Sequence, residues 1–143
     1  MNEISIIYWT GTGNTMTMAG YVAEGIKEGG KIPRVFSVDD IAPSQLRSET
    51  IFALGCPAMG AEVLEESVME PFVEELESFV AGKTVALFGS YGWGDGEWMR
   101  NWVERMEKAG AKVIGGEDAI CQEVPDEDAQ EELKSLGKEL AAL

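Results

Sequence analysis

The chain has 143 residues, 45% of them hydrophobic, which predicts one folded globular domain over residues 1–143. Its net charge of −15, from 26 acidic and 11 basic residues, argues against nucleic acid as a partner, because contacts to a phosphate backbone need clustered Lys or Arg. The sequence has no histidine, so an imidazole base and a His-ligated metal site are excluded.

No apolar run approaches the roughly 18 to 20 residues that a membrane helix needs, and no charged-then-apolar leader opens the chain. We therefore expect a cytoplasmic protein with no membrane partner and, since nothing in the sequence argues otherwise, a monomer. The two cysteines, Cys56 and Cys121, are too few and too far apart for a disulfide framework or a metal site. We expect both to be buried thiols at strand ends.

Five apolar runs predict strands at residues 4–8, 34–38, 51–56, 84–89 and 112–121, the last interrupted by Gly115-Gly116. Between them, stripes at helical spacing predict the buried faces of helices: Met16, Ala19, Val22, Ala23 and Ile26; Met69, Phe72, Val73 and Leu76; Met99, Trp102, Val103 and Met106; and Leu133, Leu136 and Leu140. This alternation predicts an α/β fold with a parallel sheet and right-handed crossovers. Strands that read as continuous apolar runs are typical of a sheet covered on both faces.

In such sheets a ligand binds beyond the carboxyl ends of the strands, which directs attention to the loops after the first, third and fourth strands. The first loop, residues 10–15, reads Thr-Gly-Thr-Gly-Asn-Thr between a strand and a helix. Unpaired N–H groups, small glycines and hydroxyl side chains are suited to hold a phosphate with neutral donors alone. A P-loop is excluded because no lysine follows, and a dinucleotide fingerprint because Met16 replaces the third glycine. A capped helix start without a ligand is the alternative.

The second loop, residues 55–62, reads Gly-Cys-Pro-Ala-Met-Gly-Ala-Glu. A phosphatase loop would carry Arg six positions after Cys56, but Glu62 stands there and would repel a phosphate. Met59-Gly60 instead predicts a turn in which the glycine peptide changes orientation at little steric cost.

The third loop, residues 90–98, places Trp93 among three glycines. We expect this ring to cover a flat ligand, the alternative being an exposed turn tryptophan without a function. Tyr91 is either a second aromatic wall or loop packing, whereas Trp98 and Trp102 are expected in the core. The three loops together suit a flat heteroaromatic ring that carries one terminal phosphate.

The chain resembles the flavodoxins, most of all the short-chain clostridial type, through residues 8–15, 58–60, 62–67 and 86–96. The resemblance covers essentially the whole chain. It implies a flavodoxin-like, doubly wound three-layer sandwich whose five-stranded parallel sheet has the order 2-1-3-4-5, with helices on both faces. It also implies non-covalently bound FMN and electron carriage without catalytic or metal-binding residues.

The cofactor-binding residues implied by the resemblance are Thr10, Gly11, Thr12, Gly13, Asn14, Thr15, Pro57, Ala58, Met59, Gly60, Glu62, Ser90, Tyr91, Gly92, Trp93, Gly94 and Asp95. The resemblance assigns the phosphate to the first loop, one face of the isoalloxazine ring to Trp93 and the other to Met59. It further places Glu62 at the ring N3–H, backbone groups around Gly92 at the pyrimidine edge, and Asp95 near the flavin.

Two positions depart from the family pattern. Pro57 replaces a small hydroxyl residue, which removes one potential hydrogen bond toward the cofactor, and Ala61 replaces a common Asp, which puts the tuning of the potential in doubt. We expect the Gly60 carbonyl to turn toward the flavin N5–H in the semiquinone, and the surrounding acids to disfavour the anionic hydroquinone.

The expected function is low-potential one-electron carriage, mainly between semiquinone and hydroquinone, toward basic-surfaced reductases and ferredoxin-dependent oxidoreductases. Seven acidic residues between positions 62 and 77 and eight between 117 and 132, with no basic residue in either stretch, suit such partners or are simply solvated helix faces. The alternative is an FMN-dependent quinone reductase or an accessory flavoprotein of one enzyme. A phospho-acceptor receiver is excluded, because positions 9–15 hold no acid and Pro57 follows the third strand.

Overall fold

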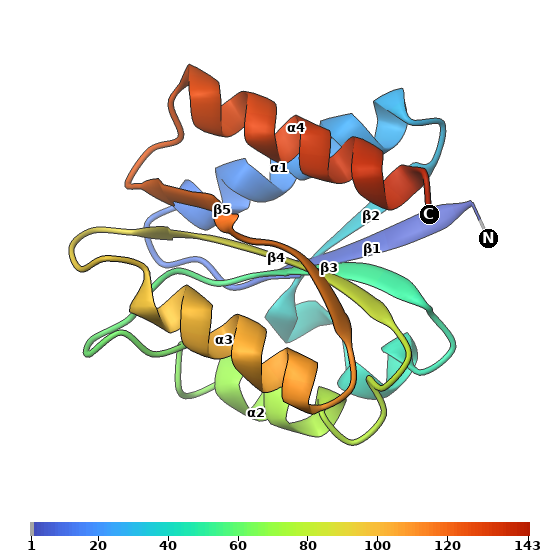
Figure 1. The fold of residues 1–143 in the computed structure, drawn as a ribbon, viewed down its shortest axis with the longest axis horizontal. Helices are drawn as coiled ribbons and strands as arrows, with labels where there is room; N and C mark the ends of the chain where they lie inside the picture. The colour runs from blue at the N-terminus through green and yellow to red at the C-terminus, as the bar shows by residue number, and fades with distance from the viewer. Residues whose placement is uncertain (1) are drawn as a thin grey trace.

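The computed structural model describes residues 2–143 as a five-stranded parallel sheet between two layers of helices (Figure 1). The strands are β1 (Glu3–Tyr8), β2 (Ile32–Ser37), β3 (Ile51–Gly55), β4 (Thr84–Tyr91) and β5 (Lys112–Gln122). The helices are α1 (Asn14–Glu28), α2 (Met69–Leu76), α3 (Glu97–Lys108) and α4 (Glu127–Ala141), with short 3₁₀ helices η1 (Val38–Asp40) and η2 (Pro43–Leu46). The strand order β2-β1-β3-β4-β5 confirms the expected α/β class and the order 2-1-3-4-5.

The helix layers cover opposite faces of the sheet, α1 and α4 on one and α2 and α3 on the other (Figure 1). Successive strand residues alternate between the two cores: Ile6 and Ala53 pack with α1 and α4, whereas Ile7 and Leu54 pack with α2 and α3. This two-sided burial is the reason that the inner strands read as continuous apolar runs. Trp98 belongs to the α2–α3 core and is 1% exposed, as expected.

The predicted helix faces are buried with one clear exception. Met16 is 49% exposed, so its assignment to the core is wrong. The buried face of α1 begins one residue earlier, at Thr15, and continues through Met18, Ala19 and Val22. Met16 therefore lies at the edge of that face, in the first turn of the helix.

The carboxyl ends of four strands also differ from the prediction, and two of them, those of β4 and β5, simply extend further, to Tyr91 and Gln122. The second strand ends at Ser37 rather than Val38, because Val38 begins η1, where the Ser37 hydroxyl accepts a hydrogen bond from the Asp39 N–H at 3.4 Å. Cys56 falls just beyond β3, although its N–H still donates to the Phe88 carbonyl.

The outer helices α1 and α4 cross at two glycines. A Cβ on Gly25 would lie 2.0 Å from the Lys134 carbonyl oxygen, and one on Gly137 would lie 2.2 Å from the Val22 carbonyl oxygen. The two backbones are therefore in direct contact. Glycine is required at both positions for this packing.

Strand β5 is irregular at the predicted interruption. Gly115 pairs with Leu87 and Ile120 with Gly89, so three extra residues of β5 bulge between these pairs. Gly115 and Gly116 both have positive φ angles, of 77° and 70°. Among the helices of residues 2–143, none has the length and apolar character to cross a membrane.

Candidate functional site

A cavity of about 470 Å³ lies at the carboxyl ends of the central strands, where the sheet topology predicts a ligand. Its lining residues are Trp9, Thr10, Gly11, Thr12, Asn14, Thr15, Pro57, Ala58, Met59, Ser90, Tyr91, Gly92, Glu123 and Val124. Within the described chain, no Lys or Arg lines it. A cavity of this size suits a small organic cofactor.

The loop between β1 and α1 forms one end of the cavity. Gly13, at φ 98°, turns the chain into the helix, and its N–H donates to the Thr10 hydroxyl at 3.0 Å. Among residues 2–143, no side chain caps the first turn of α1. The N–H groups of that turn thus remain available to an anion.

Thr15 connects this loop to the end of β4. Its hydroxyl lies 3.2 Å from the Ser90 hydroxyl at the end of β4, and both side chains are buried. The two hydroxyls therefore form one polar wall beside the helix N-terminus.

The segment after β3 forms a narrow turn. Its start is fixed by a hydrogen bond from the Ala58 N–H to the Ser90 carbonyl at 2.9 Å. Met59 and Val63 then exchange two main-chain hydrogen bonds, of 2.8 and 3.0 Å. Between them, Gly60 has φ 48° and Glu62 has φ 60°, the latter an uncommon conformation for a residue with a side chain.

Glu62 links this turn to the loop after β4. Its Oε2 accepts the main-chain N–H of Trp98 at 3.1 Å, in the first turn of α3. Its Oε1 is buried and has no hydrogen-bond partner among the described residues. Gly94 packs so closely on this carboxylate that a Cβ there would lie 2.1 Å from Oε1. Glu62 Oε1 is therefore free to accept a further hydrogen bond, although Glu62 does not line the cavity.

The loop after β4 presents one exposed and one packed aromatic ring. Trp93 is 69% exposed, which agrees both with a ring that covers a ligand and with the alternative of an exposed turn tryptophan. Tyr91 combines the two interpretations left open above: it lines the cavity, and its ring packs on Trp98 with the centroids 5.7 Å apart. Asp95 is exposed and pairs with Arg100 at 3.1 Å.

The cavity brings together part of the predicted residue set. Thr10, Gly11, Thr12, Asn14, Thr15, Pro57, Ala58, Met59, Ser90, Tyr91 and Gly92 line it. Gly13, Gly60, Glu62, Trp93, Gly94 and Asp95 lie in the same three loops but outside its lining. For every residue of the predicted set, contact with a ligand remains a prediction.

Three lining residues, Trp9, Glu123 and Val124, were not predicted. The corner after β5 is held by a hydrogen bond from the Glu123 N–H to the Tyr91 carbonyl at 2.8 Å. The Gln122 side chain donates to the Gly92 carbonyl at 3.0 Å. The rule of strand ends that selected the other loops applies equally to β5 and would have identified this corner.

Cys56 lies beside the cavity but is not a nucleophile. Burial raises the pKa of its thiol to about 12, so the thiol stays protonated near neutral pH. Neither Cys56 nor Cys121 is in a disulfide within the described chain, and both are buried as expected.

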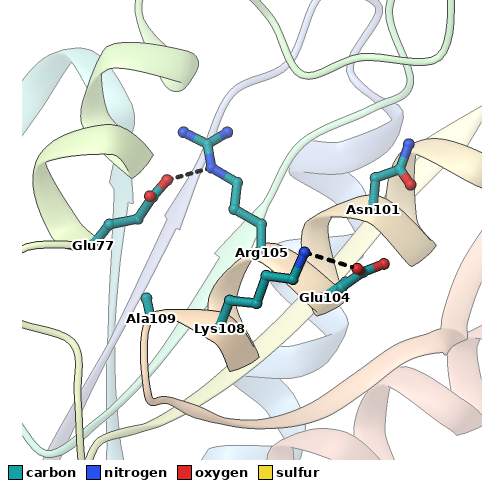
Figure 2. A pocket seen from close by; sticks show the side chains of 6 residues that line it. All are labelled: Glu77, Asn101, Glu104, Arg105, Lys108 and Ala109. Carbon is teal, nitrogen blue, oxygen red and sulfur yellow. Dashed lines mark hydrogen bonds and ion pairs between the residues drawn. The ribbon is translucent and has the colours of Figure 1, made fainter.

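A second hollow, of about 500 Å³, lies against the outer side of α3. Figure 2 shows its lining side chains, with Arg105 directed toward Glu77 and Lys108 toward Glu104. Arg105 also forms a hydrogen bond to Glu70, which, with the contact to Glu77, raises the pKa of the guanidinium despite its burial. These paired charges tie α2 to α3 and leave the cavity at the strand ends as the stronger candidate site.

Comparison with known proteins shows the family of this chain. The sequence model of the family described as Flavodoxin matches residues 6–137. The flavodoxin of Clostridium beijerinckii is 50% identical over 138 residues, which cover 96% of this chain and 99% of that protein. The flavodoxin of Megasphaera elsdenii is 46% identical over 138 residues, with 96% and 98% coverage. The solution structure of two-electron reduced M. elsdenii flavodoxin superposes with a TM-score of 0.86 at 44% identity, over 95% of this chain and 98% of that one.

Proposed function

Because the chain belongs to the flavodoxin family, whose members bind FMN and carry electrons to redox partners without being enzymes, we propose that it is a low-potential one-electron carrier. Bound FMN supplies one-electron chemistry, and in this proposal its working couple lies between the semiquinone and the hydroquinone. The single observation that carries the proposal is the cavity at the strand ends, which joins an uncapped helix N-terminus to an aromatic loop.

The polar end of the cavity fits the FMN phosphate. The uncapped first turn of α1 offers N–H groups, and Thr10, Thr12, Asn14 and Thr15 add neutral side-chain donors. Pro57 offers no donor in place of the expected hydroxyl. The Ser90 hydroxyl lies next to Thr15 and supports the same wall from β4.

The other end fits the ring. The unpartnered Oε1 of Glu62 is an acceptor that lacks a donor, and the ring N3–H is a donor of the required kind. Trp93 has most of its indole free to stack, and Met59 lines the cavity from the turn after β3. In this arrangement Trp93 and Met59 cover opposite faces of the ring, and the main chain near Gly92 meets its pyrimidine edge.

The Gly60 peptide is the proposed moving part. It lies in an exposed turn, and a Cβ at Gly60 would meet no described atom within 4 Å. We propose that its carbonyl turns to accept a hydrogen bond from an N–H at the flavin N5. A neutral hydrogen bond contributes about 0.5–1.5 kcal/mol, which corresponds to a few tens of millivolts for one electron.

Acidic residues near the site set the proposed low potential. Carboxylate oxygens of Glu62, Asp95 and Glu97 lie within 4.8 Å of one another, and Glu123 lines the cavity. Each unit charge about 10 Å away opposes a further negative charge by roughly 0.4–0.8 kcal/mol at an effective dielectric constant of about 40–80. Several such charges lower the second one-electron potential by about 100 mV or more, since about 1.4 kcal/mol corresponds to roughly 59 mV.

The same charges define the proposed partners. Exposed acids around the site favour basic-surfaced reductases and ferredoxin-dependent oxidoreductases, because complementary charge speeds encounter. We further propose that residues 1–143 act as a single domain and a monomer. The proposed location is the cytoplasm, where thiols such as Cys56 and Cys121 remain reduced.

An anaerobic dithionite titration of the purified protein, followed by absorbance from about 300 to 700 nm, tests this function. We expect a yellow protein that passes through a blue one-electron-reduced state before it bleaches. Bleaching in one two-electron step would retain the flavin but contradict one-electron carriage. A colourless protein that takes up no added FMN would overturn the proposal.

A further inference from the structure

We propose that Glu65 is a positioning residue for the turn formed by residues 59–62, and that it confines the motion of this turn to Gly60, Ala61 and Glu62. The inference rests on the proposed function only in that the turn moves with the redox state. Glu65 itself lies outside the cavity lining and three residues beyond the turn.

The Glu65 carboxylate is buried and carries an unusual number of hydrogen bonds. Glu65 is only 6% exposed. Oε1 accepts the N–H of Ser67 at 2.8 Å and also the Ser67 hydroxyl. Oε2 accepts the N–H groups of Val68 and Met69, each at 2.9 Å. Both oxygens thus hold the chain where it enters α2.

The charged form of this carboxylate is the stable one. Burial acts to raise the pKa of Glu65, but the hydrogen bonds from Ser67, Met69 and Val68 outweigh it and lower the pKa below its ordinary value. An amide cannot replace the carboxylate here. Its NH₂ group would face either the Ser67 donors or those of Val68 and Met69, so one set of donors would lose its acceptor.

The main chain of Glu65 extends this anchor to the turn. Its N–H donates to the Cys56 sulfur at 3.5 Å, while the Cys56 N–H donates to the Phe88 carbonyl at 3.1 Å. The base of the loop is therefore fixed to β4 through Cys56 and to α2 through Glu65. The next fixed level is the pair of hydrogen bonds between Met59 and Val63. Beyond that pair only three residues remain, and two of them already have positive φ angles.

An anchor of this kind has a thermodynamic consequence. If the base were loose, the turn would sample many arrangements, and the orientation that presents the Gly60 carbonyl to the cofactor would lose population. With the base fixed, the backbone entropy of the loop is already lost when the protein folds. The reorientation then changes only a few backbone dihedral angles. Glu65 thereby supports the redox step without touching the cofactor.

The test compares Glu65→Gln with Glu66→Gln. Glu66 is the next residue in the chain and is exposed, so both variants remove one negative charge from nearly the same place, and only Glu65→Gln breaks the anchor. In redox titrations of the FMN-bound proteins, we expect the equilibrium constant for forming the one-electron-reduced state to fall by about three- to tenfold in Glu65→Gln, relative to Glu66→Gln. In the FMN-free proteins, we expect amide hydrogen exchange at Met59 and Val63 to quicken by a similar factor only in Glu65→Gln.

A merely structural cap would give a different result. Glu65→Gln would then unfold at a lower temperature, while the formation constant and the exchange at Met59 and Val63 would match Glu66→Gln, and the inference would be overturned. If Glu65→Gln does not fold, Ser67→Ala removes one donor and keeps the charge, and we expect the same two changes at smaller size. If the wild-type protein shows no one-electron-reduced state, the proposed function fails, and the exchange measurement on the FMN-free protein still decides the role of Glu65.

Discussion

The Glu62 carboxylate accepts the main-chain N–H of Trp98 at 3.1 Å, so a residue from the turn after β3 closes the first turn of the helix after β4. One oxygen of this carboxylate is used in the protein, and the other is buried without a partner among the described residues. Glu62 therefore couples two loops of the site and still has an acceptor to offer.

We expect Glu62→Gln to raise the FMN dissociation constant by about tenfold and to make the second one-electron potential less negative. An amide keeps one acceptor for Trp98 but turns an NH₂ group toward the ring N3–H, and a hydrogen bond to a charged group contributes about 1.5–3 kcal/mol. Calorimetric titration with FMN and potentiometry measure the two effects. Glu97→Gln is the control, because it removes a charge within 4.8 Å of the Glu62 oxygens. If the FMN dissociation constant and the second potential change equally in both variants, Glu62 acts through its charge alone and not through a hydrogen bond to the ring.

Gly60→Val should lower the maximal yield of the one-electron-reduced state. A Cβ at this position would clash with no described atom within 4 Å, so the effect comes from the backbone alone. The present φ is 48°, so the turn already uses a conformation that side chains disfavour. A further cost of about 1–2 kcal/mol specific to the reoriented turn corresponds to roughly a 5- to 30-fold smaller formation constant. Gly60→Ala should show a smaller decrease in a spectrophotometric redox titration. An unchanged yield in Gly60→Val would refute the reorientation of this peptide.

Trp93→Ala should weaken FMN binding by about 5- to 150-fold, since stacking of a heteroaromatic ring on an aromatic side chain contributes about 1–3 kcal/mol. The indole is 69% exposed and gains a contact surface only when a ring covers it. Fluorescence titration of FMN-free protein with FMN measures the affinity. Trp93→Phe should retain part of it, and an affinity equal to that of wild type in Trp93→Ala would exclude stacking.

The stability of FMN-free protein should fall in acid partly through Glu65. Its folded pKa is depressed, so its contribution is present above the unfolded value of about 4.3 and is lost as the pH falls through the folded value. The difference in unfolding free energy between wild type and Glu65→Gln should therefore be largest above about pH 5 and shrink below about pH 4. Urea denaturation at several pH values measures it. A difference that does not vary with pH would contradict a stabilising charged form.

Two glycines of α1 should respond oppositely to the same substitution. Gly20→Ala adds a Cβ that meets no described atom within 4 Å, and it should raise the unfolding free energy by about 0.5–1 kcal/mol through helix propensity. Gly25→Ala would place a Cβ 2.0 Å from a backbone oxygen of α4 and should lower the unfolding free energy by about 1–3 kcal/mol. Thermal unfolding of FMN-free protein checks both. If both variants changed the unfolding free energy equally, the contact between α1 and α4 would accommodate the added Cβ without loss of stability.

The sequence predicted the sheet well because strands covered on both faces leave a strong apolar signal, as in Ile51–Gly55. It placed Met16 wrongly because helical periodicity does not show where a buried face begins at a helix end. The end of the second strand was displaced for a similar local reason, since η1 starts at Val38.

The lining of the cavity was predicted where chemistry-bearing residues are adjacent in sequence, as in residues 10–15. It was incomplete where contact depends on distant segments. The Glu123 corner meets Tyr91 only because β4 and β5 pair in parallel, and the Glu62–Trp98 bond joins residues 36 positions apart. Hydrogen bonds of this kind depend on the register of the folded sheet, which a local pattern does not contain.

The crossing of α1 and α4 has a consequence for how the protein is made. The loop at residues 10–15 leaves the ribosome before α4, the packing partner of the helix that follows the loop. The two helices meet at Gly25 and Gly137, which are more than 100 residues apart in the chain. A nascent chain that ends before α4 therefore presents the phosphate loop on a helix with one uncovered side. Formation of a rigid phosphate loop is thus coupled to the synthesis of α4.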